Sequence, residues 1–201
     1  MLSKPKEHLK GSFYIILSSL FFGSYGVWAR IIGSSMDNFF QAWTRGLIII
    51  SILIPIAIFT KQLRKVAKKD LGWIILISIA GVFSIAPIFY AYNVLGIGPA
   101  TLIYYASITI ASYIAGFVSF NEKITVVKIA SLILALFGLL LVFNLSLANN
   151  SLLGAVAAII AGIAGGTEVA YTKKVSGRYS SLQLCIFSWA SIFATHLVAS
   201  T

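Results

Sequence analysis

The residue whose chemistry stands out first is Arg45, because it lies inside a long apolar run of the sequence. Asn38 and Gln41 precede it at a spacing that places all three side chains on one face of a helix. An arginine carries a permanent positive charge and several N–H donors, which suits an anionic group of a small molecule or the gating of a vestibule. Two other interpretations stay open: the side chain could extend outward to water, or hydrogen-bond the end of a neighbouring helix.

Glu168 is the only acidic residue inside an apolar run. It could carry a proton or recognise a cation, or it could form a structural ion pair with nearby Lys173 or Lys174 or with a cation of another helix. His196 lies in the last apolar run. It could relay a proton, because imidazole titrates near neutral pH, or it could hydrogen-bond across helices. Each residue is therefore a candidate for a solute or proton site, with a structural alternative beside it.

The sequence does not indicate an enzyme. Its two histidines are His8 and His196, and it contains no paired carboxylates, no H-E-x-x-H motif and no G-x-S-x-G motif. Cys185 is the single cysteine, so there is neither a disulfide framework nor a metal-binding spacing. We therefore expect no catalytic residue, no metal site and no cofactor.

The elements that must position these residues are membrane spans. Of the 201 residues 59% are hydrophobic and 10% are charged, whereas a soluble domain carries roughly 25% charged residues. About 20 mainly apolar residues cross the hydrocarbon core of a bilayer. The runs that approach this length are 12–32, 39–60, 71–93, 100–120, 124–143, 152–172 and 182–199. The sequence predicts an all-α membrane protein, an antiparallel bundle of transmembrane helices in a lipid bilayer.

Lysine and arginine are segregated among the connections between these runs. The N-terminal tail and the second, fourth and sixth connections hold most of the 15 basic residues. Because basic residues concentrate on the cytoplasmic side, we predict a cytoplasmic N-terminus in a multi-pass protein of the cell (plasma or inner) membrane. The net charge of +10 has the same origin, so no nucleic-acid partner is expected.

Two apolar segments, 11–34 and 154–177, resemble each other. At an offset of 143 positions, identical residues coincide at Gly11 and Gly154, Ile16 and Ile159, and Gly23 and Gly166. Such a repeat matters because it determines the whole fold. The same offset places Ser188 opposite Arg45, so the arginine is not duplicated.

Small residues recur every fourth position in two of the predicted helices. They are Gly154, Ala158, Gly162, Gly166 and Ala170 in one helix, and Ser107, Ala111, Ala115 and Ser119 in the other. Such stripes let helix backbones approach closely. They predict tight helix–helix seams, either within one chain or between the two chains of a homodimer.

Aromatic side chains gather near the ends of the predicted spans. Among them are Trp28, Tyr92, Tyr104, Tyr105 and Tyr171. They could rim a solute cavity, or form the aromatic belt that membrane proteins place at the lipid–water interface.

With these features the chain resembles the EamA-type branch of the drug/metabolite transporter superfamily. Trp28 and Arg30 close the first run, Arg45 lies in the second, and 120–123 read Phe-Asn-Glu-Lys where the family commonly has Leu-Gly-Glu-Arg. The resemblance covers nearly the whole chain. Thr109 stands where the family commonly has a proline, so we expect a straighter fourth helix. Glu122, in the matching turn, is expected to be a structural anchor.

The resemblance implies ten spans in two five-helix halves. Residues 1–148 would form the first half and 149–201 the first two helices of the second, so we expect the chain to be part of a longer product. Because five is an odd number, the second half would enter the membrane from the opposite side. The halves would then be inverted repeats, the second incomplete, with a solute site near the membrane midplane.

The function implied is that of a secondary transporter, which moves a small organic solute by alternating access. The substrate-binding candidates are Trp28, Gln41, Arg45, Tyr104, Tyr105, Glu168, Tyr171 and His196. The alternative is a non-transporting membrane scaffold, or an inactive fragment of a transporter.

Overall fold

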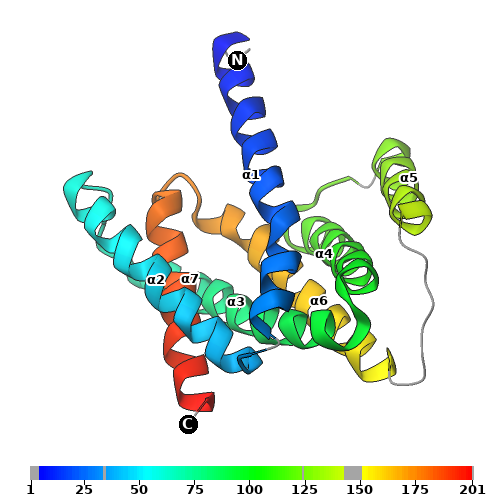
Figure 1. Ribbon diagram of the computed structural model, residues 1–201. Coiled ribbons are helices and arrows are strands. Elements are labelled where there is room, and N and C mark those ends of the chain that lie inside the picture. The colour runs from blue at the N-terminus through cyan, green and yellow to red at the C-terminus, as the bar shows by residue number, and fades with distance from the viewer. Residues whose placement is uncertain (1–4, 34, 124, 143–150, 201) are drawn as a thin grey trace.

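The computed structural model describes residues 5–33, 35–123, 125–142 and 151–200. These residues form seven α-helices joined by short connections (Figure 1). In chain order the helices are α1 (Pro5–Gly33), α2 (Asn38–Phe59), α3 (Lys68–Leu95), α4 (Ile97–Phe120), α5 (Val126–Val142), α6 (Ser151–Val175) and α7 (Ser181–Ala199). The prediction of an all-α protein is confirmed, and each helix corresponds to one predicted run.

Six helices in the described part of the chain are long and apolar enough to cross a membrane. The exception is α5, whose apolar portion, Val126–Gly138, is shorter than the others. A helix pairs its own backbone N–H and C=O groups, which is the condition for crossing hydrocarbon. The helices therefore confirm a multi-pass membrane bundle.

Helix α3 lies at the centre of the bundle. It packs most extensively against α6 and α7, and also against α1, α2 and α4 (Figure 1). Of its apolar window 56% is buried, compared with 11% for α1. Ala80, Gly81, Ser84 and Ala91 are small and buried, so neighbouring helices can approach α3 from several sides. The other helices are therefore placed relative to α3.

The predicted small-residue seam joins α4 and α6 within this chain. A Cβ atom added to Gly162 would lie 2.6 Å from the Tyr104 carbonyl oxygen. One added to Gly166 would lie 2.6 Å from the Ile108 carbonyl oxygen. The Ser112 hydroxyl also donates a hydrogen bond across the seam to the Gly166 carbonyl, at 3.3 Å. These two glycines thus let the backbones of one chain touch, without a second copy.

The three basic connections lie at one end of the bundle, as the predicted topology requires. The α2–α3 connection, 60–67, hydrogen-bonds to the α6–α7 connection, 176–180. The α4–α5 turn is joined to the last turn of α6 by an ion pair between Glu122 and Lys173. We call this end of the bundle the basic end.

Glu122 anchors the α4–α5 turn. Its carboxylate accepts hydrogen bonds from Lys173 at 2.7 Å and from Lys128 at 3.2 Å. Asn121 adopts a left-handed φ of 52°, which reverses the chain and lets the Glu122 N–H reach the Gly116 carbonyl. The hydrogen bonds from Lys173 and Lys128 hold the pKa of Glu122 below its ordinary value. Its pairs therefore stabilise the turn at neutral pH, and this contribution is lost as the pH falls through the lowered pKa.

A second contact at the basic end, which we name the loop clasp, joins Asp70 at the start of α3 to Arg178 and Tyr179. Arg178 donates from Nε to Asp70 Oδ2 at 3.0 Å and from Nη2 to Oδ1 at 2.9 Å. The Tyr179 hydroxyl donates to Asp70 Oδ2 at 2.9 Å and accepts from the Ala67 N–H at 3.0 Å. Asp70 is only 2% exposed, so its charge depends on these partners.

The clasp predicts an unequal response to removal of its two charges. Arg178→Ala leaves the buried Asp70 carboxylate without its cation, and we expect it to lower the free energy of unfolding by roughly 3 kcal/mol. Asp70→Ala should cost less, because the Arg178 side chain is 46% exposed and can be hydrated. Thermal unfolding midpoints in a neutral detergent measure both, with the exposed Lys123→Ala as control. The reverse ranking would contradict the assignment.

The seam predicts different effects of alanine substitution on stability at two glycines, Gly166 and Gly23, that occupy equivalent positions in the repeat. Gly166→Ala should lower the free energy of unfolding by roughly 1–3 kcal/mol, because the added methyl meets the α4 backbone. Gly23→Ala should be neutral or slightly stabilising, since nothing lies within 4 Å of its added Cβ. The same thermal assay compares the two variants. Equal effects would show that the close contact of Gly166 with α4 contributes nothing to stability.

Candidate functional site

A partly buried polar layer lies where α3, α6 and α7 meet, and it contains the carboxyl group of Glu168. The Ser188 hydroxyl of α7 donates to Glu168 Oε1 at 2.6 Å. Gly81 of α3 faces this pair, because a Cβ added there would lie 3.2 Å from Glu168 Oε1 and collide with the Ser188 hydroxyl. The absence of a side chain at Gly81 therefore makes the space in which the carboxylate lies.

The lysines that follow Glu168 in the sequence do not pair with it. Lys173 Nζ binds Glu122 Oε1 at 2.7 Å, and Lys174 Nζ donates to the Ser119 carbonyl at 3.0 Å. Of the ion pairs that the sequence left open for Glu168, those with Lys173 and Lys174 are not formed, and none with another helix is found among the described residues. The hydrogen-bond partner of its carboxylate is the neutral hydroxyl of Ser188.

The next turn of the α3–α6 contact holds a second polar pair. The hydroxyls of Ser84 on α3 and Tyr104 on α4 lie 3.2 Å apart. Gly165 of α6 leaves room for them, since its added Cβ would be 3.1 Å from Ser84 Oγ and 3.3 Å from Tyr104 Oη. Gly165 and Glu168 are one helical turn apart, as are Gly81 and Ser84. The two hydrogen-bonded pairs therefore form one polar layer along the α3–α6 contact.

Arg45 belongs to α2, and its side chain lies between Tyr25 of α1 and Phe89 of α3. Its guanidinium carbon is 4.6 Å from the ring centre of Tyr25 and 4.8 Å from that of Phe89. Aromatic faces stabilise a desolvated cation by about 2 kcal/mol or more, and they leave the edge of the guanidinium plane for other partners. The Tyr25 and Thr44 hydroxyls are buried without a hydrogen-bond partner in the described part of the chain.

Neither Arg45 nor Glu168 belongs to an ion pair among the described residues. The pairs found there join Lys128 and Lys173 to Glu122, and Arg178 to Asp70, all at the basic end. At 1.5 Å per residue, Arg45 lies roughly 10 Å inside the first residue of α2, and Glu168 lies a similar distance from the end of α6. Two ionisable side chains of opposite type thus lie about two turns inside helices that are apolar enough to cross a membrane, without an ion-pair partner among the described residues.

The sequence repeat relates the surroundings of Arg45 to those of Glu168. The offset of 143 positions pairs Tyr25 with Glu168 and Arg45 with Ser188. Tyr25 contacts Arg45, and Glu168 contacts Ser188, so equivalent positions touch in both copies. Both contacts lie against α3, at Phe89 and Gly81. The sequence repeat therefore has a counterpart in the packing of side chains.

Two further candidates are held by contacts near helix ends. Gln41 is 1% exposed. In the amide orientation that satisfies both of its ends, it donates to the Ala29 carbonyl at 3.1 Å and accepts from the Gly33 N–H at 3.3 Å. Tyr171 stacks on Trp73 with ring centres 5.4 Å apart. Gln41 thus fixes the end of α1 against α2, and Tyr171 joins α6 to α3.

The remaining candidates lie apart from the polar layer or at its margin. Trp28 is 58% exposed on α1, and Tyr105 is 39% exposed, with its ring at the edge of Tyr104. His196 is 3% exposed, and its Nδ1 lies 2.8 Å from the Ile192 carbonyl of its own helix. The structure therefore brings Tyr104 and Glu168 into one layer, whereas Arg45 of α2 lies outside that layer, against Phe89 of α3.

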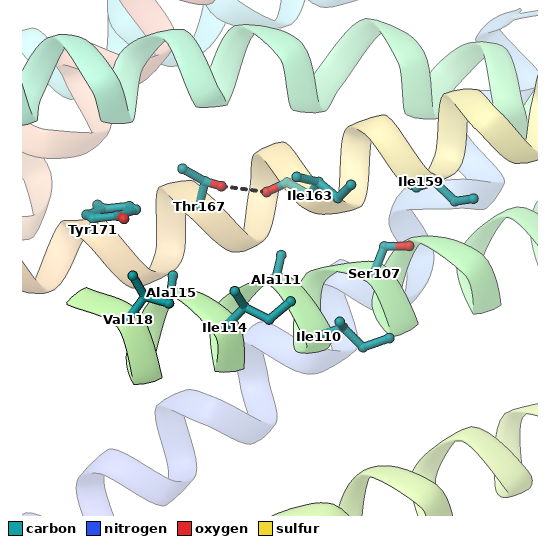
Figure 2. A pocket seen from close by; sticks show the side chains of 10 residues that line it. All are labelled: Ser107, Ile110, Ala111, Ile114, Ala115, Val118, Ile159, Ile163, Thr167 and Tyr171. Carbon is teal, nitrogen blue, oxygen red and sulfur yellow. Dashed lines mark hydrogen bonds between the residues drawn. The ribbon is translucent and has the colours of Figure 1, made fainter. Parts of the chain in front are cut away.

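Two apolar grooves flank this region. The larger, of about 510 Å³, runs between α4 and α6 and is lined by branched and small side chains (Figure 2). Thr167 in this groove donates its hydroxyl to the Ile163 carbonyl of its own helix at 2.8 Å. The Tyr171 hydroxyl, at the end of the groove, is hydrogen-bonded to Ser119 at 2.7 Å. The second groove, of about 360 Å³, lies beside His196 and Tyr90.

Sequence reasoning missed several polar residues that the structure uses. Asp70 could have been noticed as the one carboxylate next to five basic residues. Tyr25 and Ser188 could have been found by applying the repeat offset to Glu168 and Arg45. Ser84 has no signal, because a serine in an apolar helix commonly hydrogen-bonds its own backbone.

Comparison with known protein families gives one match. The model of a family described as the EamA-like transporter family matches residues 9–144. No curated protein matches the chain. The matched segment contains Tyr25, Arg45, Ser84 and Tyr104, whereas Glu168 lies beyond it.

The polar layer predicts energetic coupling between Ser188 and Glu168. Ser188→Ala removes the hydroxyl that is hydrogen-bonded to the half-buried Glu168 and should lower the free energy of unfolding by roughly 1–3 kcal/mol. In a Glu168→Ala background the same change should cost much less, which a double-mutant cycle of thermal unfolding measures. Ser191→Ala, on the same helix, is the matched control. Equal costs in both backgrounds would mean that the hydrogen bond contributes nothing.

Proposed function

The chain belongs to the EamA-like transporter family, and from this premise we propose that it moves a small organic solute across a cell membrane by alternating access. The observation that carries the proposal is the pair of intramembrane charges, Arg45 and Glu168, which have no ion-pair partner among the described residues. A charge at this depth costs several kcal/mol unless it faces protein, water or a ligand. Such residues are characteristic of solute and ion pathways.

The two charges are suited to different groups. Arg45 binds an anionic part of the solute through the edge of its guanidinium, while Tyr25 and Phe89 hold its faces. The unpartnered Tyr25 and Thr44 hydroxyls supply further hydrogen bonds to the same group. Glu168 accepts a proton or a cationic group, and its partner Ser188 can turn its hydroxyl to suit either state.

The contacts between equivalent positions support the proposal of inverted repeats. In that arrangement the N-terminus lies in the cytoplasm, the basic end is cytoplasmic, and the solute site lies between the halves. The proposed boundary between 1–148 and 149–201 lies outside the described residues. The bound solute therefore passes between sites built from equivalent parts of each half.

The other candidates have supporting places in this proposal. Tyr104 lies in the polar layer, whereas Trp28 and Tyr105 are exposed enough to form part of an aromatic belt. Gln41 and Tyr171 position the helices that carry Arg45 and Glu168. His196 borders the smaller groove. A homodimer would use surfaces other than Gly162 and Gly166, because α4 covers them.

Alternating access further requires the basic end to open and close. The loop clasp links α3 to the α6–α7 connection, and so joins one proposed half to the other. With the clasp formed, the solute reaches Arg45 from the opposite end of the bundle. Opening the clasp would release it at the basic end.

The proposal predicts that both intramembrane charges are needed for flux but not for folding. Tracer uptake into proteoliposomes, measured with a panel of radiolabelled organic acids, amines and amino acids, first identifies a transported solute. Arg45→Gln and Glu168→Gln should each lower its flux about tenfold or more. Arg30→Gln, at the end of α1, is the matched control. Wild-type flux in both variants, or no flux of any solute with the wild type, would contradict the proposal and favour a non-transporting scaffold.

A further inference from the structure

The α2–α3 connection carries an unusual concentration of positive charge. Positions 61–69, which we name the basic loop, contain five basic residues, all of them exposed: Lys61, Arg64, Lys65, Lys68 and Lys69. The one carboxylate beside them, Asp70, is buried and bound by Arg178 and Tyr179. None of the ion pairs among the described residues involves the basic loop. Its charge is therefore not neutralised by an ion pair with any residue in the part of the chain that the structure describes.

The backbone of the basic loop is held in place by the α6–α7 connection and the start of α7. The Arg64 N–H donates to Gln183 Oε1 at 3.0 Å, and Gln183 Nε2 donates to the Arg64 carbonyl at 2.6 Å. The Ser180 hydroxyl donates to the Gln62 carbonyl at 3.1 Å. Lys61 reverses the chain with a left-handed φ of 53°. Because this backbone is already fixed, the loop loses little conformational entropy when its cations bind a ligand.

Exposed apolar side chains accompany these cations. Phe59, the last residue of α2, is 85% exposed, and Leu63 within the loop is 46% exposed. The end of a membrane-crossing helix lies where hydrocarbon gives way to headgroups. A soluble phosphate would match the cations but not Phe59 and Leu63. A phospholipid matches both, because its phosphate and its acyl chains are joined.

We propose that the basic loop is a binding site for an anionic phospholipid. Its lysines bind the headgroup phosphate and Phe59 and Leu63 contact the adjoining acyl chain. Because Gln183, Ser180 and Tyr179 hold the same segment, a bound lipid stabilises the loop clasp. The inference goes beyond solute transport and does not depend on it, since lipid binding is measured without any solute.

The test uses the full chain in neutral detergent micelles. Phosphatidylglycerol is titrated against phosphatidylcholine, and bound lipid is counted by native mass spectrometry while the thermal unfolding midpoint is followed. The wild type should retain phosphatidylglycerol preferentially and gain thermal stability from it. Combined Lys→Gln changes at Lys61, Lys65, Lys68 and Lys69 should weaken that binding about tenfold or more.

Matched variants and a soluble headgroup separate the outcomes. Lys→Arg changes at the same four positions keep the charge and should keep the binding, and Lys123→Gln should leave it unchanged. If the glutamine variant does not fold, the Lys68→Gln, Lys69→Gln double variant should show a partial loss. Equal binding of both lipids, undiminished binding by the glutamine variant, or equal stabilisation by inorganic phosphate would overturn the proposal.

Discussion

The energetic penalty of placing charge in hydrocarbon is the constraint on which this structure depends. At the basic end, where water is near, carboxylates and cations are paired: Glu122 with Lys128 and Lys173, and Asp70 with Arg178. Inside the membrane, Arg45 is enclosed by aromatic faces and Glu168 is held by one hydroxyl. The ion pairs therefore organise the connections, whereas Arg45 and Glu168 have no ion-pair partner among the described residues.

Close approach of backbones is what makes such placement possible. Gly162 and Gly166 bring α6 against α4, and Gly81 and Gly165 leave the space occupied by polar side chains of α3, α4, α6 and α7. In lipid, apolar burial contributes little to helix association, so van der Waals packing and interhelical hydrogen bonds must hold the bundle. Two of these glycines thus allow close helix packing, and the other two leave room for polar contacts.

Hydropathy alone predicted the helices, because each span must pair its own backbone and therefore reads as a continuous apolar run. The spacing of small residues likewise predicted the α4–α6 seam. The loop clasp could not be predicted, because Asp70 and Arg178 are 108 positions apart and follow no periodic pattern. The hydrogen-bond partner of Glu168 could not be predicted for a related reason: Lys173 and Lys174 are near in sequence, but in space they contact the end of α4 and the turn after it. Closeness in sequence along one helix does not determine which side chains interact when neighbouring helices offer other partners.

The two copies of the repeat keep one contact but change its chemistry. Tyr25 and Arg45 place an aromatic ring and a cation together, whereas the equivalent Glu168 and Ser188 place a carboxylate and a hydroxyl together. A purely structural contact would need only complementary shape, and apolar residues would meet that need at lower cost in lipid. The two copies instead hold different ionisable groups, a guanidinium in one and a carboxyl group in the other, so the two positions differ in the chemical partner that suits them.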